Sequence, residues 1–215
     1  MSKIYIMENE RLSVSAELAF IERSTDEELI NYIYHTPLCN SNVPRFFQVA
    51  SKNTIKLFLR LNVLSGKNEE VLLDTQDVEL LSLYFERYIM RDEIIAKMFE
   101  IGNPEIISAY IRYHKLPEAH EAKLFSAGYE KEAAYYVMHY PLYVVSEVPM
   151  MIFGGVNMVR NYITRQDLHA EAEKLLLTPR FDCLVNEYRR LWCFSREVKP
   201  LYDEWFSTFT NCEEE

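Results

Sequence analysis

Large apolar residues recur along this sequence with a period of 26 residues. Starting at Tyr32, every step of 26 residues meets an aromatic side chain, although aromatic residues make up only 13% of the chain. The series is Tyr32, Phe58, Tyr84, Tyr110, Tyr136, Tyr162 and Tyr188. A fixed period of this length indicates a chain built from repeated structural units.

Two further apolar series keep the same period without insertion or deletion. Six residues after each aromatic stand Leu38, Leu64, Met90, Leu116, Leu142, Leu168 and Phe194. Three residues before each aromatic stand Leu29, Ile55, Leu81, Ile107, Ala133, Val159 and Val185. Because all the intervals are equal, we interpret 26 residues as one structural unit.

The apolar spacing inside one repeat is that of a helix. Leu29, Tyr32, Ile33 and Thr36 fall at i, i+3, i+4 and i+7, which is one face of an α-helix. A shorter apolar segment precedes this face in each repeat. Each repeat is therefore predicted to hold two short antiparallel helices.

Residues that begin and end helices stand where such pairs require them. Gly102, Gly128 and Gly154 share one repeat position, where we expect a positive φ to end the first helix of the pair. Asn103 and Pro104 then supply an N-cap and a first-turn proline for the second helix. The residues that begin and end helices therefore stand at positions that agree with the helical spacing.

The predicted fold is all-α, a right-handed α-α superhelix (solenoid) of about seven two-helix repeats in a single domain, residues 1–215. Residues 1–11 are predicted to be an N-terminal cap, and residues 194–215 a C-terminal capping helix with an acidic tail. The predicted repeats are 12–37, 38–63, 64–89, 90–115, 116–141, 142–167 and 168–193. Helices this short do not persist alone in water, so stacking of neighbouring repeats must stabilise them.

Composition adds a soluble, acidic character to this picture. The formal net charge is −10, which repels nucleic acid unless basic residues gather on one face. The first residues carry no apolar signal segment, and no apolar run is long enough to cross a membrane. The four cysteines have no metal or disulfide spacing, so we expect reduced thiols and a cytoplasmic protein.

With these residues laid out, the chain resembles the helical-repeat superfamily that includes armadillo and HEAT proteins. Residues 170–176, together with the positions of Val159 and Tyr162, are similar to short α-repeats in uncharacterised bacterial proteins. The resemblance implies a superhelical fold and a surface that binds other macromolecules. The period is shorter than that of armadillo or HEAT repeats and their diagnostic signatures are absent, so no family-specific ligand is implied.

No catalytic, cofactor-binding or metal-binding motif occurs in the sequence. His114 and His120 lie near Glu118 and Glu121, which leaves a small metal site open as an alternative to an ordinary surface loop. Most Glu and Asp residues are interpreted as helix starts or solvent-facing positions. We therefore expect no cofactor, no metal and no enzymatic activity.

Aromatic and basic residues gather in the series that follow the tyrosines. In stacked repeats these positions form a stripe at the C-terminal ends of the second helices. The residues predicted to bind a protein or peptide partner are Arg87, Tyr88, Arg112, Tyr113, His114, His139 and Tyr140. Tyr and Arg are typical of interface hot spots. The alternative is that these side chains cover helix ends or compensate the helix dipole.

Two other functions stay open from the sequence. A nearly uncharged segment containing Met150, Met151, Ile152 and Phe153 is either core or a surface for self-association. Nucleic-acid binding by a HEAT-like superhelix is the other alternative, but the basic series is interrupted by Glu86, so we expect no nucleic acid or membrane as partner.

Overall fold

The computed structural model describes residues 12–210, and every regular element in that range is a helix. The predicted N-terminal cap, residues 1–11, and the end of the acidic tail, residues 211–215, lie outside the described residues. The chain separates into two units, Met1–His114 and Lys115–Glu215. We describe each unit by itself.

The N-terminal unit contains eight helices in its described part. Their bounds are α1 Val14–Arg23, α2 Asp26–His35, α3 Val43–Val49, α4 Lys52–Leu61, α5 Gly66–Asp74, α6 Val78–Phe85, α7 Asp92–Ile101 and α8 Pro104–Ile111.

The C-terminal unit contains seven α-helices and a 3₁₀ turn in its described part. Their bounds are α9 Glu118–Ser126, α10 Glu130–His139, α11 Val144–Phe153, α12 Val156–Ile163, α13 Ala170–Leu176, the turn Pro179–Phe181, α14 Asp182–Leu191 and α15 Lys199–Thr210.

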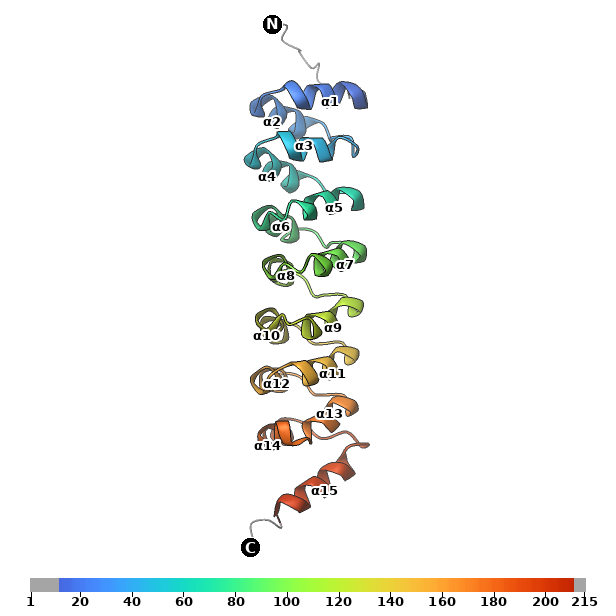
Figure 1. Cartoon of the computed structure of the whole chain (residues 1–215), viewed down its shortest axis with the longest axis vertical. Helices are drawn as coiled ribbons and strands as arrows, with labels where there is room; N and C mark the ends of the chain where they lie inside the picture. The colour runs from blue at the N-terminus through green and yellow to red at the C-terminus, as the bar shows by residue number, and fades with distance from the viewer. Residues whose placement is uncertain (1–11, 211–215) are drawn as a thin grey trace. The chain divides into compact units, whose positions relative to one another are not determined.

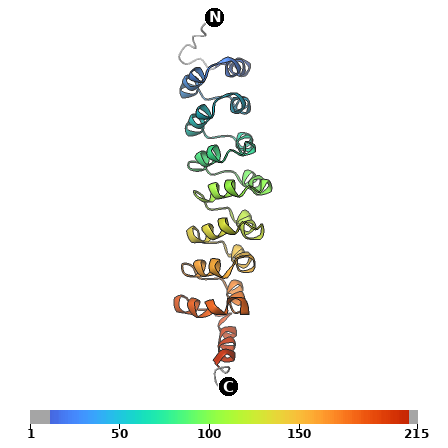
Figure 2. The same ribbon diagram turned by 60° about the vertical axis from the view of Figure 1, so that its left-hand side comes forward.

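Within each unit the helices pack in two layers, one of odd-numbered and one of even-numbered helices (Figures 1 and 2). In the N-terminal unit α1, α3, α5 and α7 contact in sequence, as do α2, α4, α6 and α8. In the C-terminal unit α9 contacts α11, α11 contacts α13, and α10, α12 and α14 follow one another in the same way. The result is an all-α stack in which each predicted 26-residue interval holds two helices.

The tyrosine series forms the centre of the packing, as the sequence predicted. Tyr84, Tyr110, Tyr136 and Tyr188 are fully buried, and Tyr32, Phe58 and Tyr162 are exposed by no more than 3%. Burial of a large apolar side chain contributes about 1.5–3 kcal/mol relative to exposure. The series therefore links the odd layer to the even layer rather than offering rings to a ligand.

The predicted start of α8 is confirmed, and α2 and α4 begin with caps of the same kind. Thr25 makes a capping box with Glu28, and the Ser51 side chain accepts the N–H of Thr54 at the start of α4. Asn103 accepts the N–H of Glu105 at 3.0 Å, beside a proline in the first turn of α8.

One of the three predicted helix-ending glycines is different from the prediction. Gly102 (φ 70°) and Gly128 (φ 82°) have the expected positive φ, but Gly154 has φ −73°. A Cβ at Gly154 would lie 2.4 Å from the Met150 carbonyl oxygen. Close approach of the backbone at the end of α11, and not positive φ, therefore requires this glycine.

Candidate functional site

Five glutamates of the odd-numbered helices are buried against the tyrosine series. Each lies in the first turn of its helix, as the sequence predicted for most acids, but with an exposed fraction between 0 and 3% it faces the core and not solvent. Each accepts a hydrogen bond from the tyrosine hydroxyl 15 residues further on. The pairs are Glu17–Tyr32, Glu69–Tyr84, Glu121–Tyr136, Glu147–Tyr162 and Glu173–Tyr188.

The Glu121–Tyr136 pair also holds two backbone N–H groups in place. The Tyr136 hydroxyl donates to Glu121 Oε1 at 2.9 Å and accepts the Leu116 N–H at 3.0 Å. The other carboxylate oxygen, Oε2, accepts the N–H of Tyr143 at 2.7 Å, where α11 begins. The pair therefore fixes the chain just before α9 and just before α11, with most of its hydrogen-bonding capacity used.

Burial changes the ionisation of these pairs. It raises the pKa of Glu121 and of Glu147 above the ordinary value, against opposing hydrogen bonds from their partners. Burial and the neighbouring carboxylate also raise the pKa of Tyr136 and Tyr162 well above the usual range. Perturbed pKa values often mark active sites. Here the oxygens are engaged inside the core, which fits a structural role.

The predicted partner-binding residues of the N-terminal unit divide into two groups. Arg87 donates to the carbonyl oxygen of Arg60 at 2.5 Å, and His114 contacts the carbonyl oxygen of Phe85. Both side chains thus satisfy the last carbonyls of the preceding even-numbered helix, as the alternative interpretation expected. Tyr88 is half-buried, with its ring centroid 4.9 Å from that of Tyr84.

Arg112 and Tyr113 are the two predicted residues of this unit that project into solvent without such a role. Tyr113 is 38% exposed, and Arg112 is exposed and forms no ion pair with any acid among residues 12–210. Both lie where α8 ends, next to His114.

The two predicted residues of the C-terminal unit pack on their own helix. The His139 ring stacks on Tyr135 at 3.9 Å and its Nδ1 lies 2.7 Å from the Tyr135 carbonyl oxygen. Tyr140 is half-buried, 4.9 Å from Tyr136 between ring centroids. Nearby, Arg165 donates to the carbonyl oxygen of Met138, which repeats the contact made by Arg87.

Additional exposed residues in the N-terminal unit extend the predicted stripe. They lie at the end of α4 and in the segments that follow α4 and α6, and they comprise one arginine and three apolar residues that the predicted set omitted. We define the arginine edge as Arg60, Leu61, Val63, Arg87, Ile89, Arg112 and Tyr113. The apolar members Leu61, Val63 and Ile89 are 47, 68 and 69% exposed. Continuing the Arg112 series back by two repeats finds Arg60 in the sequence.

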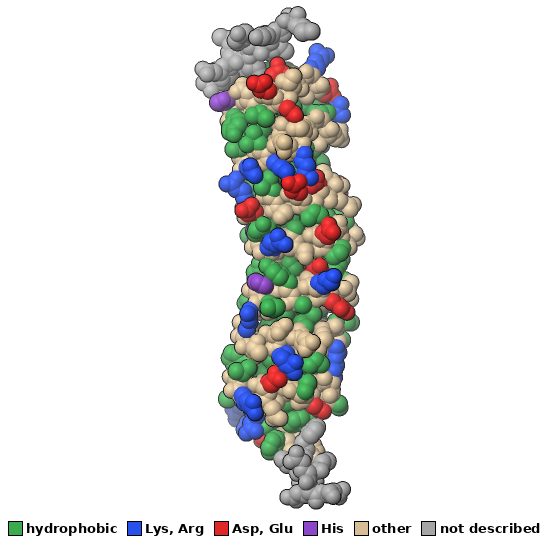
Figure 3. Space-filling view, turned by 90° about the vertical axis from the view of Figure 1, so that its left-hand side faces the viewer, with side chains coloured by type: hydrophobic (Ala, Val, Ile, Leu, Met, Phe, Trp, Pro, Cys, Tyr) green, Lys and Arg blue, Asp and Glu red, His purple; other side chains and the backbone are tan. Residues whose placement is uncertain are grey.

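The arginine edge is continuous because its helix ends touch. The contact from Arg87 to the Arg60 carbonyl joins the end of α6 to that of α4, and the contact from His114 to Phe85 joins the end of α8 to that of α6. Figure 3 shows the face of the even-numbered helices, on which basic and hydrophobic side chains are interspersed.

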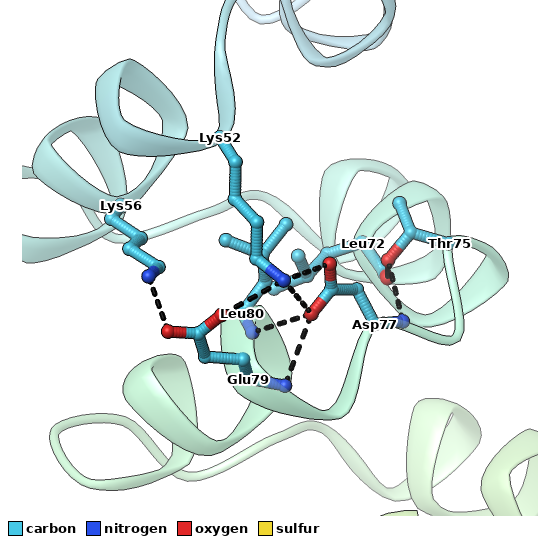
Figure 4. A network of polar contacts seen from close by, with 7 residues as sticks. All are labelled: Lys52, Lys56, Leu72, Thr75, Asp77, Glu79 and Leu80. Carbon is cyan, nitrogen blue, oxygen red and sulfur yellow. Dashed lines mark hydrogen bonds and ion pairs between the residues drawn. The ribbon is translucent and has the colours of Figure 1, made fainter.

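The opposite ends of α4 and α6 are joined by a polar network (Figure 4). Lys52 lies 2.6 Å from Asp77 Oδ2 and 2.8 Å from Glu79, and Lys56 also pairs with Glu79. Hydrogen bonds from both lysines lower the pKa of Glu79 to about 2. Burial opposes ionisation of Asp77, but hydrogen bonds from Lys52 and the Leu80 N–H hold its pKa below the ordinary value. The lysines are thus neutralised within the protein.

A cleft of about 550 Å³ runs between α4 and α6 from this network to the arginine edge. Its lining residues are Lys56, Arg60, Val78, Glu79, Ser82, Leu83 and Glu86. Lys56 is paired, whereas Arg60 and Glu86 form no ion pair within residues 12–210. The cleft therefore combines an apolar wall from α6 with free charges at the edge.

The predicted self-association segment is only partly on the surface. Met150 and Met151 are buried in the core, at 0 and 1% exposure, so they form no surface. Ile152 and Phe153 are 49 and 56% exposed. With Val145, 56% exposed, they give α11 an uncharged outer side.

No ligand set for a metal occurs in the described residues. Among residues 12–210 no three His, Cys, Asp or Glu side chains come together in a way that would hold an ion. Glu121, named in the alternative metal site, has its carboxylate engaged by Tyr136 and Tyr143.

No helix within residues 12–210 combines the length and the apolar character needed to span a bilayer. The resemblance to armadillo and HEAT proteins extends to an all-helical, stacked arrangement. Comparison of the chain with protein-family models, with curated proteins and with solved structures finds no match.

Proposed function

We propose that the chain is an α-α superhelix of seven two-helix repeats in one domain. Support comes from hydrogen bonds that recur at the sequence period. A hydrogen bond from a tyrosine hydroxyl to a buried glutamate occurs in the 26-residue intervals that contain Tyr32, Tyr84, Tyr136, Tyr162 and Tyr188. Bonds from the end of one even-numbered helix to the preceding one recur at Arg87, His114, Arg165 and Trp192.

On this fold we propose a non-catalytic scaffold that binds a protein or peptide along its even-numbered helices. The observation that carries the proposal is the arginine edge. Arg60, Arg87 and Arg112 have no ion pair among residues 12–210, whereas five of the seven other Lys and Arg residues in residues 12–114 have an acidic partner. Exposed apolar side chains stand between these arginines.

This combination suits an interface in energetic terms. Exposed apolar area that becomes buried favours association by about 25 cal/mol per Å², and the part that exceeds the cost of lost translational and side-chain freedom appears as affinity. Unpaired arginines provide orientation and can form bidentate hydrogen bonds to carboxylates. Because neighbouring helix ends carry similar groups, the binding energy is expected to be spread over several repeats with a few anchors.

Site-specific photocrosslinking in a native lysate tests the scaffold. A benzophenone amino acid replaces Tyr113 on the arginine edge, and in a matched control it replaces Lys67, an exposed residue of α5. We expect a discrete protein adduct at position 113 that is absent at position 67. Adducts of equal yield at both positions, or none at position 113, would contradict the proposed surface.

A second candidate is homotypic assembly through α11, favoured by the uncharged outer side that contains Val145, Ile152 and Phe153. Sedimentation of the full chain tests it, with Ile152→Asp as the variant and Val63→Asp, at an exposed apolar position after α4, as the control. Assembly that only Ile152→Asp disrupts would support this candidate. A wild-type monomer at high concentration would exclude it.

A further inference from the structure

The arginine edge carries positive charge on an otherwise acidic chain. Three arginines stand against one glutamate, Glu86, whereas the whole chain has a net charge of −10. At the opposite ends of the same helices the acids Asp77 and Glu79 at the start of α6 neutralise Lys52 and Lys56 of α4, and α8 carries Glu105 in its first turn. An anionic partner is therefore drawn to the arginine edge, whose arginines have no acidic partner within residues 12–210, and not to the neutralised lysines at the other end of α4.

The spacing of the edge fits an extended chain. Stacked helices lie about 8–10 Å apart, so the ends of α4, α6 and α8 offer one group per 8–10 Å. A polyproline II segment has three residues per turn and rises about 3.1 Å per residue, so every third side chain returns to the same side after about 9 Å. The two general periods therefore agree, at about 9 Å for each helix end and each third residue.

The chemistry of the edge favours a peptide over a nucleic acid. Exposed Leu61, Val63 and Ile89 alternate with the arginines and require apolar side chains opposite them. Glu86 interrupts the positive row and opposes an unbroken polyanion such as a phosphate backbone. Spaced carboxylates avoid this repulsion.

We propose that the arginine edge binds an acidic segment of a partner protein in the polyproline II conformation, with a carboxylate at every third residue. The carboxylates meet Arg60, Arg87 and Arg112 in turn, and an intervening apolar side chain enters the cleft between α4 and α6, against Val78 and Leu83. This inference rests on the proposed scaffold function and specifies the partner of the same surface.

Defined peptides test the inference by fluorescence anisotropy with the full chain. The first probe repeats Glu-Pro-Leu over about twelve residues, which places a carboxylate on one side at each turn. A second probe has the same composition with its glutamates in one block. A third replaces each glutamate by lysine. We expect the first probe to bind at least about tenfold more tightly than the other two, and to weaken as salt is added.

Variants locate the binding. Arg60→Glu with Arg112→Glu changes two exposed side chains that hold no ion pair within residues 12–210, and we expect at least about a tenfold loss of affinity for the first probe. Lys67→Glu is the matched control, because it reverses an exposed and equally unpaired charge on α5, and we expect affinity to change by less than about twofold. Circular dichroism and urea midpoints establish that each variant is folded.

Each other result overturns the inference in a distinguishable way. Equal affinity for the first two probes would show that a carboxylate at every third residue is not required. An equal loss of affinity in Lys67→Glu would show that the arginine edge is not the binding site. Tighter binding of a single-stranded oligonucleotide to the arginine edge identifies a nucleic-acid surface instead. If no probe binds while photocrosslinking at position 113 recovers a protein, the scaffold stands and the acidic partner is wrong. If wild-type protein is a dimer that Arg60→Glu with Arg112→Glu dissociates, the occupant is a second copy.

Discussion

Tyr136 donates its hydroxyl hydrogen to the Glu121 carboxylate at 2.9 Å, and the same two positions three repeats earlier hold Phe58 and Val43. Where the hydroxyl is missing, the buried carboxylate is missing too. A buried charge without its hydrogen-bond donors costs several kcal/mol, so the glutamate depends on the tyrosine. The tyrosine also occurs without the glutamate, since Tyr110 follows Ile95 at the same spacing. The repeat that contains Val43 and Phe58 thus shows both residues of the pair replaced together by apolar ones.

A double-mutant cycle on this pair should show strong coupling. Tyr136→Phe removes the hydrogen bond to Glu121 Oε1 and the acceptor of the Leu116 N–H, so we expect a loss of about 1–3 kcal/mol in the free energy of unfolding. Glu121→Val alone leaves the tyrosine hydroxyl without its acceptor. The double variant, which reproduces Val43 with Phe58, should cost less than the sum, as measured by urea denaturation. Additive losses would show that the two side chains act independently.

The stability should depend on pH through Glu121. Burial raises the pKa of this carboxyl in the folded protein above the ordinary 4.5, so the folded state holds the proton more tightly than the unfolded chain. Its contribution is complete below the unfolded pKa and is lost as pH rises through the folded pKa. Relative to Glu121→Gln, wild type should therefore become less stable from about pH 4.5 to pH 7. Urea midpoints of both proteins, measured across this pH range, test the prediction. A difference between the two midpoints that does not change with pH would refute it.

Alkaline unfolding should coincide with ionisation of the buried tyrosines. Burial raises the pKa of Tyr84, Tyr136, Tyr162 and Tyr188 above the ordinary 10.0. These tyrosines favour folding below that pH, and the advantage is lost above it, because unfolded tyrosines ionise first. Tyrosinate absorbance from these residues should appear together with loss of helical circular dichroism. Full tyrosinate absorbance with helices intact would contradict the buried arrangement.

Two glycines at equivalent repeat positions should respond differently to alanine. Gly128 has φ 82° and no atom within 4 Å of an added Cβ, so Gly128→Ala should cost about 1 kcal/mol for the left-handed backbone. At Gly154 the Cβ would meet the Met150 carbonyl oxygen at 2.4 Å, and the backbone must shift. Gly154→Ala should therefore lower the urea midpoint further than Gly128→Ala. The reverse order would contradict the close contact at the end of α11.

Much of the fold could be predicted because the repeat fixes local geometry. Equal intervals between Tyr32 and Tyr188 locate helix pairs, and caps such as Asn103 and Thr25 bring their own hydrogen-bond partners within a few residues. The candidate site was only partly predictable. Arg112 and Tyr113 were identified from their series, whereas the roles of Arg87 and His114 depend on carbonyl groups 27 and 29 residues earlier.

The sequence by itself determined the all-α class, the helix boundaries and the buried tyrosine series, because periodicity and capping act over short distances along the chain. Only the tertiary structure decided which charges are buried and which are free. Glu121 and Glu79 are both acids near the start of a helix, yet one lies inside the core against Tyr136 and the other pairs with lysines in solvent. Their environments are set by neighbouring helices, whose contacts the local pattern of residues does not specify.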